Sequence, residues 1–233
     1  MIKVELPDIE ISNSIVEIWA HLTPQQQELL RDQFTVYLYK KREVIYCEGE
    51  VPTHLLCLLS GKVKVFKEGI GGREQIIRFI TPINYFGYRA YFAQGEYVTC
   101  ASAVEATQIC TIPMKIIEQL IYENNDVAMF FIRQLSADLG IADERTVNLT
   151  QKHVRGRLAE SLLFLKDNYG LEEDNCTLSI YLSREDLANL SNMTTSNAIR
   201  TLSNFVNEHL IAMDGRKIKL IDEERLKKIS KIG

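Results

Sequence analysis

The stretch LSREDLANLSNMTTSNAIRTL, from Leu182 to Leu202, places two short amphipathic segments on either side of a tight polar break. Ser183 is a typical helix N-cap, and Asp186 adds an acidic side chain to the first turn. After the break, Thr194 and Thr195 offer a second N-cap. Apolar residues then recur at a spacing of three and four, which predicts a core-facing stripe: Ala198, Ile199, Leu202, Phe205 and Val206. The stretch therefore predicts a helix-turn-helix.

The second helix of this motif leaves polar residues on its other face: Thr195, Ser196, Asn197 and Arg200. A helix in the DNA major groove reads base edges with residues near its N-terminal end, and these residue types suit that task. We therefore predict that these four residues read DNA bases.

A basic hairpin is expected after the helix-turn-helix, with strands over 210–213 and 216–221 around an Asp214-Gly215 signal for a type I′ turn. Lys217 and Lys219 alternate with apolar residues, so they should point outward. We predict a winged helix-turn-helix in which Ser183, Thr194, Lys217 and Lys219 contact DNA phosphates.

The first half of the chain has the pattern of an all-β domain after a helical stretch at 12–33. Glycine and proline residues punctuate short alternating segments, which suggests a sandwich or jelly roll. The predicted strands cover 44–46, 55–59, 62–66, 75–79, 97–101 and 108–112.

A long helix is predicted from Asn125, capped there or by Asn124, to Leu149, with another over 154–169. Its apolar residues recur mostly every four positions: Val127, Phe131, Leu135, Leu139 and Ala142. This stripe either packs on its own domain or on a partner helix. The helix lies between a β-domain and a DNA-reading module, which favours a dimer helix. The expected domains are 1–124, 125–150 and 151–233.

Composition narrows the function classes for this chain of 233 residues with net charge −4. The five cysteines lack any CxxC pair, so neither a disulfide framework nor a zinc ribbon is indicated, and no metal site is expected. The sequence shows neither a signal peptide nor an apolar run of the roughly 20 residues that a membrane helix needs, so we expect a cytoplasmic protein without membrane association. No nucleophile–base pair or carboxylate pair suggests an enzyme.

The order of these parts resembles the CRP/FNR family of bacterial transcription regulators over nearly the whole chain. Five local matches carry the resemblance: Glu48-Gly49-Glu50, Leu59 to Val65, Gly72-Arg73-Glu74, Phe86-Gly87, and Asn148 through Leu163. The resemblance implies an α+β protein with an N-terminal double-stranded β-helix, that is, a jelly-roll domain like those that bind cyclic nucleotides. It further implies a central dimerisation helix and a C-terminal winged helix-turn-helix.

As function, the resemblance implies a homodimer that binds double-stranded DNA at a palindromic operator, with RNA polymerase as a further partner and a signal sensed in the β-roll. The alternative is a nucleotide- or metabolite-binding module whose helix-turn-helix mediates protein contacts.

The chain departs from the cyclic-AMP-binding members at the effector site. By position, Tyr88 replaces the glutamate that binds the ribose, Tyr97 replaces the arginine that pairs with the phosphate, and Ala142-Asp143 replaces the Thr-Ser pair that contacts the purine. Burying a phosphate without its arginine costs on the order of several kcal/mol, which argues against cyclic AMP. Arg89 could instead pair with some other anion. The expected effector pocket comprises Gly87, Tyr88, Arg89, Tyr97, Val98, Ala142 and Asp143.

Other cofactors of the family are constrained by the positions of cysteine and histidine. The N-terminal cysteine cluster that holds the iron–sulfur centre of FNR-type sensors is absent before Cys47, so no such cluster is expected. The sequence leaves haem as a candidate cofactor, with His21, His54 or Cys47 as its axial ligand. In the recognition helix, Thr195-Ser196 stands where the family often has Arg-Glu, which predicts a different half-site.

Overall fold

The computed structural model describes residues 2–4, 16–69 and 71–232. The chain forms two compact units. One comprises Met1–Glu68 with Ile77–Leu139, and the other comprises Gly69–Ile76 with Gly140–Gly233. The predicted α+β architecture, with an N-terminal β-roll, a long helix and a C-terminal winged helix-turn-helix, is confirmed.

Two short helices lie between the first two strands of the chain: α2 (Val16–Trp19) and α3 (Pro24–Arg31). Thr23 caps α3 in a capping box with Gln26, and Pro24 occupies the first helical turn, where a missing N–H costs nothing. Residues 12–15 of the predicted helical stretch lie outside the described residues.

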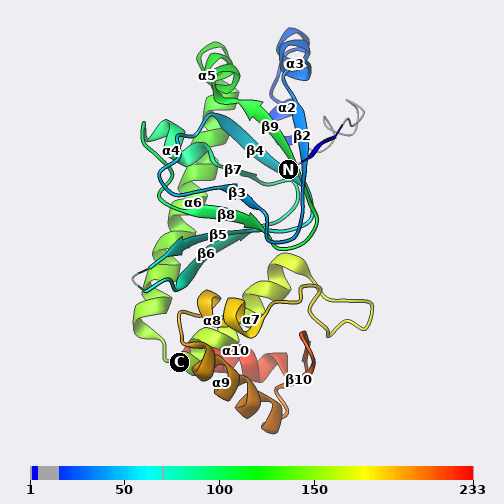
Figure 1. The fold of residues 1–233 in the computed structure, drawn as a ribbon, viewed down its shortest axis with the longest axis vertical. Helices are drawn as coiled ribbons and strands as arrows, with labels where there is room; N and C mark the ends of the chain where they lie inside the picture. Colours follow the sequence, from blue (N-terminus) through cyan, green and yellow to red (C-terminus); the bar gives the residue numbers. More distant parts are fainter. Residues whose placement is uncertain (1, 5–15, 70, 233) are drawn as a thin grey trace. The chain divides into compact units, whose positions relative to one another are not determined.

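The β-roll consists of two antiparallel sheets (Figure 1). The five-stranded sheet has the order β1 (Ile2–Val4), β2 (Thr35–Tyr39), β9 (Thr107–Pro113), β4 (His54–Ser60) and β7 (Tyr85–Phe86). The four-stranded sheet has the order β3 (Val44–Tyr46), β8 (Cys100–Ala103), β5 (Val63–Glu68) and β6 (Glu74–Ile80). The strand predicted from Tyr97 begins only at Cys100, because Tyr97 belongs to a loop whose backbone pairs with Gly49 and Glu50.

Two apolar clusters fill the β-roll. One is formed mostly by strand residues of both sheets, such as Leu58, Val65 and Ile109, together with the loop residue Tyr97. The other lies where helices pack against the five-stranded sheet. Helix α4 (Tyr88–Phe92) and helix α5 (Met114–Glu123) contribute to it, with Tyr88 and Ile117 fully or almost fully buried.

Helix α6 (Asn125–Gln151) is the long predicted helix, and the Asn124 side chain accepts a hydrogen bond from the Asp126 amide at its start. Its predicted dimer stripe needs correction. Val127 and Phe131 are 0% and 3% exposed and pack in this chain's own core, where Phe131 contacts Tyr88 and Phe92. They cannot also face a partner. The periodicity showed an apolar face, but it could not show which surface covers that face.

The C-terminal unit contains helices α7 (Val154–Tyr169), α8 (Arg184–Leu190), α9 (Thr195–Asn207) and α10 (Glu223–Ile232). Strands β10 (Ile211–Asp214) and β11 (Lys217–Leu220) form the predicted hairpin. Its turn is not type I′. That turn needs positive φ at both central residues, whereas Gly215 has a φ of 57° and Arg216 does not have a positive φ.

Candidate nucleic-acid interface and effector cavity

Each helix of the helix-turn-helix begins at a residue whose side chain caps its N-terminus. The Ser183 hydroxyl accepts from the Asp186 amide at 3.0 Å and donates to the Asp186 carboxylate at 2.7 Å. The Thr194 hydroxyl accepts from the Asn197 amide at 3.3 Å. Both side chains therefore fix helix N-termini, as the sequence predicts, and these N-termini present backbone N–H groups and a positive dipole end. Their contact with DNA phosphates stays a prediction.

Arg157 of α7 holds the turn between the two helices. Its guanidinium donates to the carbonyl oxygens of Ser191 at 2.9 Å, Asn192 at 3.0 Å and Lys152 at 2.8 Å. Asn192 lies in the left-handed region with a φ of 49°. Nearby, the buried Ser191 hydroxyl donates to that of Ser161 at 2.8 Å. These hydrogen bonds thus tie the turn between α8 and α9 to α7.

The outer face of α9 differs from the sequence expectation at two positions. Thr195, Ser196 and Arg200 are exposed, whereas Asn197 is half-buried. Ile199, predicted to be in the core, is 47% exposed because Thr201 takes the inward position instead. Ile199 lies four residues after Thr195 and three after Ser196, so it belongs to the face that sequence reasoning assigned to DNA. An exposed isoleucine there can contact the methyl group of thymine.

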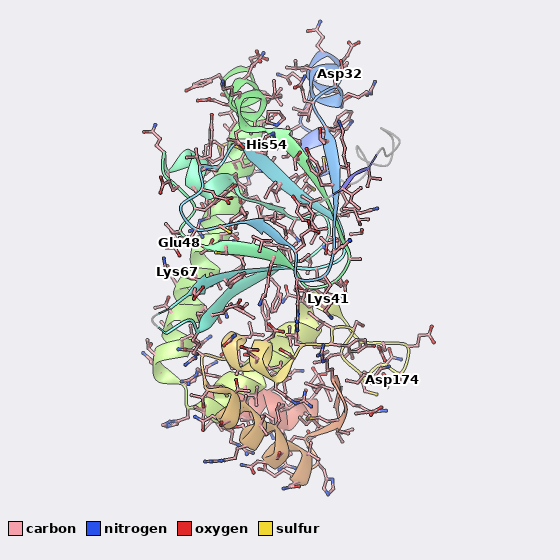
Figure 2. All side chains as sticks on the ribbon, viewed as in Figure 1. Asp32, Lys41, Glu48, His54, Lys67 and Asp174 are labelled. Carbon is pink, nitrogen blue, oxygen red and sulfur yellow. The ribbon has the colours of Figure 1, made fainter. Side chains whose placement is uncertain are left out.

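The two wing lysines form ion pairs within the chain, which the sequence did not predict. Lys217 and Lys219 point outward, but they pair with Glu172 at 3.4 Å and Asp174 at 3.3 Å. Figure 2 labels Asp174 on the loop that supplies these carboxylates. Arg216 at the wing tip is exposed. Among the described residues, its guanidinium forms no ion pair. Arg184 donates to the Gly215 carbonyl oxygen at 2.7 Å and lies near Arg216. These two arginines form a second candidate phosphate contact.

A cavity of about 1160 Å³ opens in the β-roll. The stretch from Tyr85 to Ala93 supplies one wall, and strand residues such as Val65 and Ile77 supply another. Helix α6 contributes Leu135 and Asp138. Of the predicted pocket residues, the structure brings Gly87, Tyr88, Arg89, Tyr97 and Val98 to this lining.

Ala142 and Asp143 are not among the residues that line the cavity, and both are exposed on α6. The helix instead contributes Asp138, more than one turn before Asp143. Counting positions from the family pattern could not show that the cavity lining on α6 lies at Asp138 instead of at Ala142 and Asp143. The one sign of it in the sequence is that Asp138 is another acidic residue on the same helix, five positions before Asp143.

The charged residues of the cavity are mostly paired. Arg78 and Asp138 form an ion pair at 2.6 Å between β6 and α6, and both are half-buried. Glu48 and Lys67 lie side by side at one edge of the roll (Figure 2) and pair at 2.6 Å. Arg89 is exposed, and its guanidinium has no ion pair among the described residues. An anion entering this cavity would therefore find Arg89 free to bind.

Aromatic rings form much of the remaining surface. The rings of Tyr46 and Tyr97 stack with centroids 3.9 Å apart. Burial raises the pKa of Tyr88 to about 12, and burial also raises the pKa of Tyr97 well above its ordinary value. Both phenols are therefore neutral at physiological pH and able to donate a hydrogen bond to a ligand. Gly87 has a φ of 85°, and a Cβ there would lie 3.1 Å from the Tyr97 hydroxyl oxygen.

The three candidate haem ligands do not line this cavity. The His21 ring packs against Phe130 with centroids 6.5 Å apart, and the His54 ring is hydrogen-bonded to the Thr53 hydroxyl at 2.8 Å. Figure 2 shows His54 well apart from Glu48 and Lys67. Within the described part of the chain, no three His, Cys, Asp or Glu side chains gather in a way that could hold a metal ion.

None of the helices in the described residues combines the length and the apolar character needed to cross a membrane.

Comparisons with known proteins agree with this geometry. Residues 37–124 match the cyclic nucleotide-binding domain family, and residues 156–229 match the Crp-like helix-turn-helix domain family. A CRP-like cAMP-activated global transcriptional regulator of Mycobacterium tuberculosis is 23% identical over 90% of this chain and 94% of its own length. The transcriptional activator protein Anr of Pseudomonas protegens is 24% identical over 80% of this chain and 77% of its own.

Solved structures show the same fold. FixK2 from Bradyrhizobium japonicum superposes with a TM-score of 0.76 at 24% identity, over 84% of this chain and 96% of that one. A CRP/FNR-family regulator from Eubacterium rectale gives a TM-score of 0.76 at 21% identity, over 92% and 97%. With a nucleotide-binding-like β-roll and a Crp-like helix-turn-helix in one chain, the protein belongs to the CRP/FNR family of DNA-binding transcription regulators.

Proposed function

We propose that this protein is a homodimeric regulator that binds palindromic operators and responds to an effector, other than cyclic AMP, in the β-roll cavity. The observation that carries the proposal is the exposed face of α9, which displays Thr195, Ser196, Ile199 and Arg200 from a capped, tightly held helix. RNA polymerase is the further partner that we propose, on the basis of the family.

Arg200 is the residue on this face best suited to sequence recognition. It is exposed, and its guanidinium has no ion pair among the described residues, so it is free to bind guanine O6 and N7 in a bidentate manner. Ser196 and Ile199 complete a surface that can accept a thymine methyl group and a polar base edge beside it.

The test is selection of bound duplexes from a random library by the purified protein, followed by affinity measurements on the recovered site. We expect an inverted repeat. Arg200→Ala should weaken binding to that site by ~1–3 kcal/mol while leaving random DNA largely unaffected. Arg200→Lys should lose nearly as much, since lysine keeps the charge without the bidentate fork.

Lys228→Ala is the matched control because this exposed lysine lies on α10, outside the helix-turn-helix and the wing. Equal losses on specific and random duplexes in Arg200→Ala would mean that Arg200 holds only phosphate. Absence of any duplex binding would favour the alternative in which the helix-turn-helix contacts protein.

The effector site supports a ligand other than cyclic AMP. Two neutral phenols, Tyr88 and Tyr97, stand at the expected positions of the ribose-binding glutamate and the phosphate-binding arginine. Arg78 is engaged by Asp138, which leaves Arg89 as the one exposed cavity arginine without an ion pair among the described residues. We infer an effector that offers hydrogen-bond acceptors to the phenols and a negative charge to Arg89.

Titration calorimetry tests this inference. Cyclic AMP should give no binding at micromolar concentrations, because its phosphate would lose water without gaining the usual buried arginine. Micromolar binding of cyclic AMP that disappears in Arg89→Ala would show that Arg89 takes over the phosphate contact, and would overturn this part of the proposal.

Helix α6 supplies the route from the cavity to the DNA-binding unit. Asp138 lies on this helix and pairs with Arg78 of the cavity wall, so an effector bound at Arg89 releases Asp138 where its negative charge also draws Arg78 away. We propose that this exchange alters how two α6 helices pair and so repositions the two recognition helices.

A further inference from the structure

Four of the five cysteines lie opposite one another in pairs within the β-roll. Cys57 of β4 is the register partner of Cys110 of β9. In the other sheet, Tyr46 of β3 is opposite Ala101 of β8. Continuing that register by one residue brings Cys47 opposite Cys100, and the Cys100 Sγ accepts a hydrogen bond from the next amide, that of Glu48, at 3.3 Å.

Directly opposed residues of antiparallel strands have Cα atoms about 4.5–5.5 Å apart. A disulfide requires a Cα separation of about 4.4–6.8 Å. By this spacing both pairs meet the Cα separation that a disulfide requires, and the five cysteines form no disulfide with one another in the structure.

The two pairs differ in their access to solvent. Cys57 and Cys110 are both 0% exposed, and burial raises the pKa of both thiols, that of Cys110 to about 12. Cys47 and Cys100 are half-exposed. Partial desolvation and then the adjacent Cys100 thiol raise the pKa of Cys47, which places the two thiols in direct interaction. Buried thiols are inert, whereas exposed neighbours can react.

We propose that Cys47 and Cys100 form a redox-active dithiol that a low-molecular-weight disulfide, such as oxidised glutathione, converts reversibly into an intramolecular disulfide. One cysteine thiolate attacks the oxidant's S–S bond, which forms a mixed disulfide and releases one glutathione thiolate. The other cysteine thiolate attacks the mixed disulfide and releases the second. The protein loses two protons and two electrons, and the oxidant is reduced to two thiols.

The position of this dithiol gives its oxidation a consequence. Tyr46 and Glu48, on either side of Cys47, line the effector cavity, as does Thr99 beside Cys100. Two backbone hydrogen bonds already join the same segments, from the Gly49 amide to the Tyr97 carbonyl oxygen at 2.8 Å and from the Tyr97 amide to the Glu50 carbonyl oxygen at 2.9 Å. A disulfide would restrict the motion of this rim. The redox state would then affect ligand binding in the cavity, in addition to the effector itself.

The experiment places the full-length protein in glutathione buffers of increasing oxidised fraction, traps free thiols with an alkylating reagent and maps the peptides by mass spectrometry. We expect a Cys47–Cys100 linked peptide, while Cys57 and Cys110 stay alkylatable only after denaturation. Amide hydrogen exchange should show slower exchange at Gly49 and Tyr97 in the oxidised protein. Oxidation should be faster at higher pH, because the raised pKa of Cys47 limits its thiolate fraction.

Single variants make the result specific. Cys47→Ser and Cys100→Ser should each leave one thiol that stops at the mixed disulfide with glutathione. Cys176→Ser, which removes the half-exposed cysteine of the other unit, should give the wild-type result. Mixed disulfides on both Cys47 and Cys100 of the wild type, a disulfide between two copies, or a Cys57–Cys110 bond formed first would overturn the proposal. None of these readouts involves DNA, so they are independent of the proposed function.

Discussion

Gly49 and Gly61 share a backbone conformation but differ in their surroundings. Their φ angles are 85° and 87°, a region that residues with a Cβ rarely adopt. A Cβ on Gly49 would meet nothing within 4 Å. A Cβ on Gly61 would lie 2.5 Å from both the Ala106 carbonyl oxygen and the Thr107 hydroxyl oxygen. Gly61 therefore permits a close approach of two chain segments, whereas Gly49 permits only a turn.

We expect Gly49→Ala to lose ~1–2 kcal/mol of unfolding free energy, the cost of a left-handed non-glycine residue. Gly61→Ala should lose roughly 1–3 kcal/mol more, since backbone atoms must also move to relieve the clash. Denaturant unfolding of both variants measures the difference. Equal losses of unfolding free energy in the two variants would show that residues 106–107 can move away from the new Cβ without cost.

The recognition helix depends on an ion pair at its C-terminal end. Glu208 follows α9 and pairs in a bidentate manner with Arg155 of α7, whose guanidinium also lies 4.9 Å from the centre of the Phe205 ring. Hydrogen bonding to Arg155 holds the pKa of Glu208 below its ordinary value of 4.5. The pair thereby anchors the C-terminal end of α9, opposite to the end that we propose faces DNA.

A lowered pKa in the folded state makes this stabilisation dependent on pH. It is fully present above pH 4.5, the ordinary value, and is lost as the pH falls through the lowered value, because the unfolded state binds the proton first and the folded Glu208 is then protonated as well. Urea midpoints measured against pH should therefore fall less steeply below pH 4.5 in Glu208→Gln than in the wild type. Glu173→Gln, at an exposed loop position, should keep the wild-type slope. A wild-type slope in Glu208→Gln would contradict the assignment.

At the scale of the whole molecule, the side of α6 that points away from the core is the candidate for pairing two chains. Met129, Ile132 and Leu139 are exposed and recur with the small residue Ser136 at spacings of three, four and three. This seven-residue pattern is typical of helix pairing. It replaces the stripe through Val127 and Phe131, which the core already covers.

Leu139→Glu should convert the proposed dimer into a monomer in sedimentation analysis, because it places a charge in the apolar contact that we propose between helices. Ile141→Glu is the matched control. Leu139 and Ile141 are 63% and 62% exposed, but two residues turn an α-helix by about 200°, so Ile141 lies on another side. A monomer in both variants, or in neither, would contradict the face that we assign.

Local sequence patterns predict the order and type of the main elements, because those patterns act over a few residues. Caps such as Ser183 and Thr194, the apolar spacing of α9 and the alternation in β-strands act over a few residues, and the structure shows each of them. The combination of a β-roll, a long helix and a winged helix-turn-helix was therefore predictable.

Contacts between distant parts of the chain determine which surface each pattern faces. A periodicity gives the spacing of an apolar stripe but not its partner, so Phe131 was assigned to a dimer and Ile199 to a core, each against the observed packing. Ion pairs such as Lys219 with Asp174, and the opposition of Cys47 and Cys100, join residues distant in the chain. Asp138 enters the cavity for the same reason: the sheet that α6 packs against fixes which side of the helix turns inward.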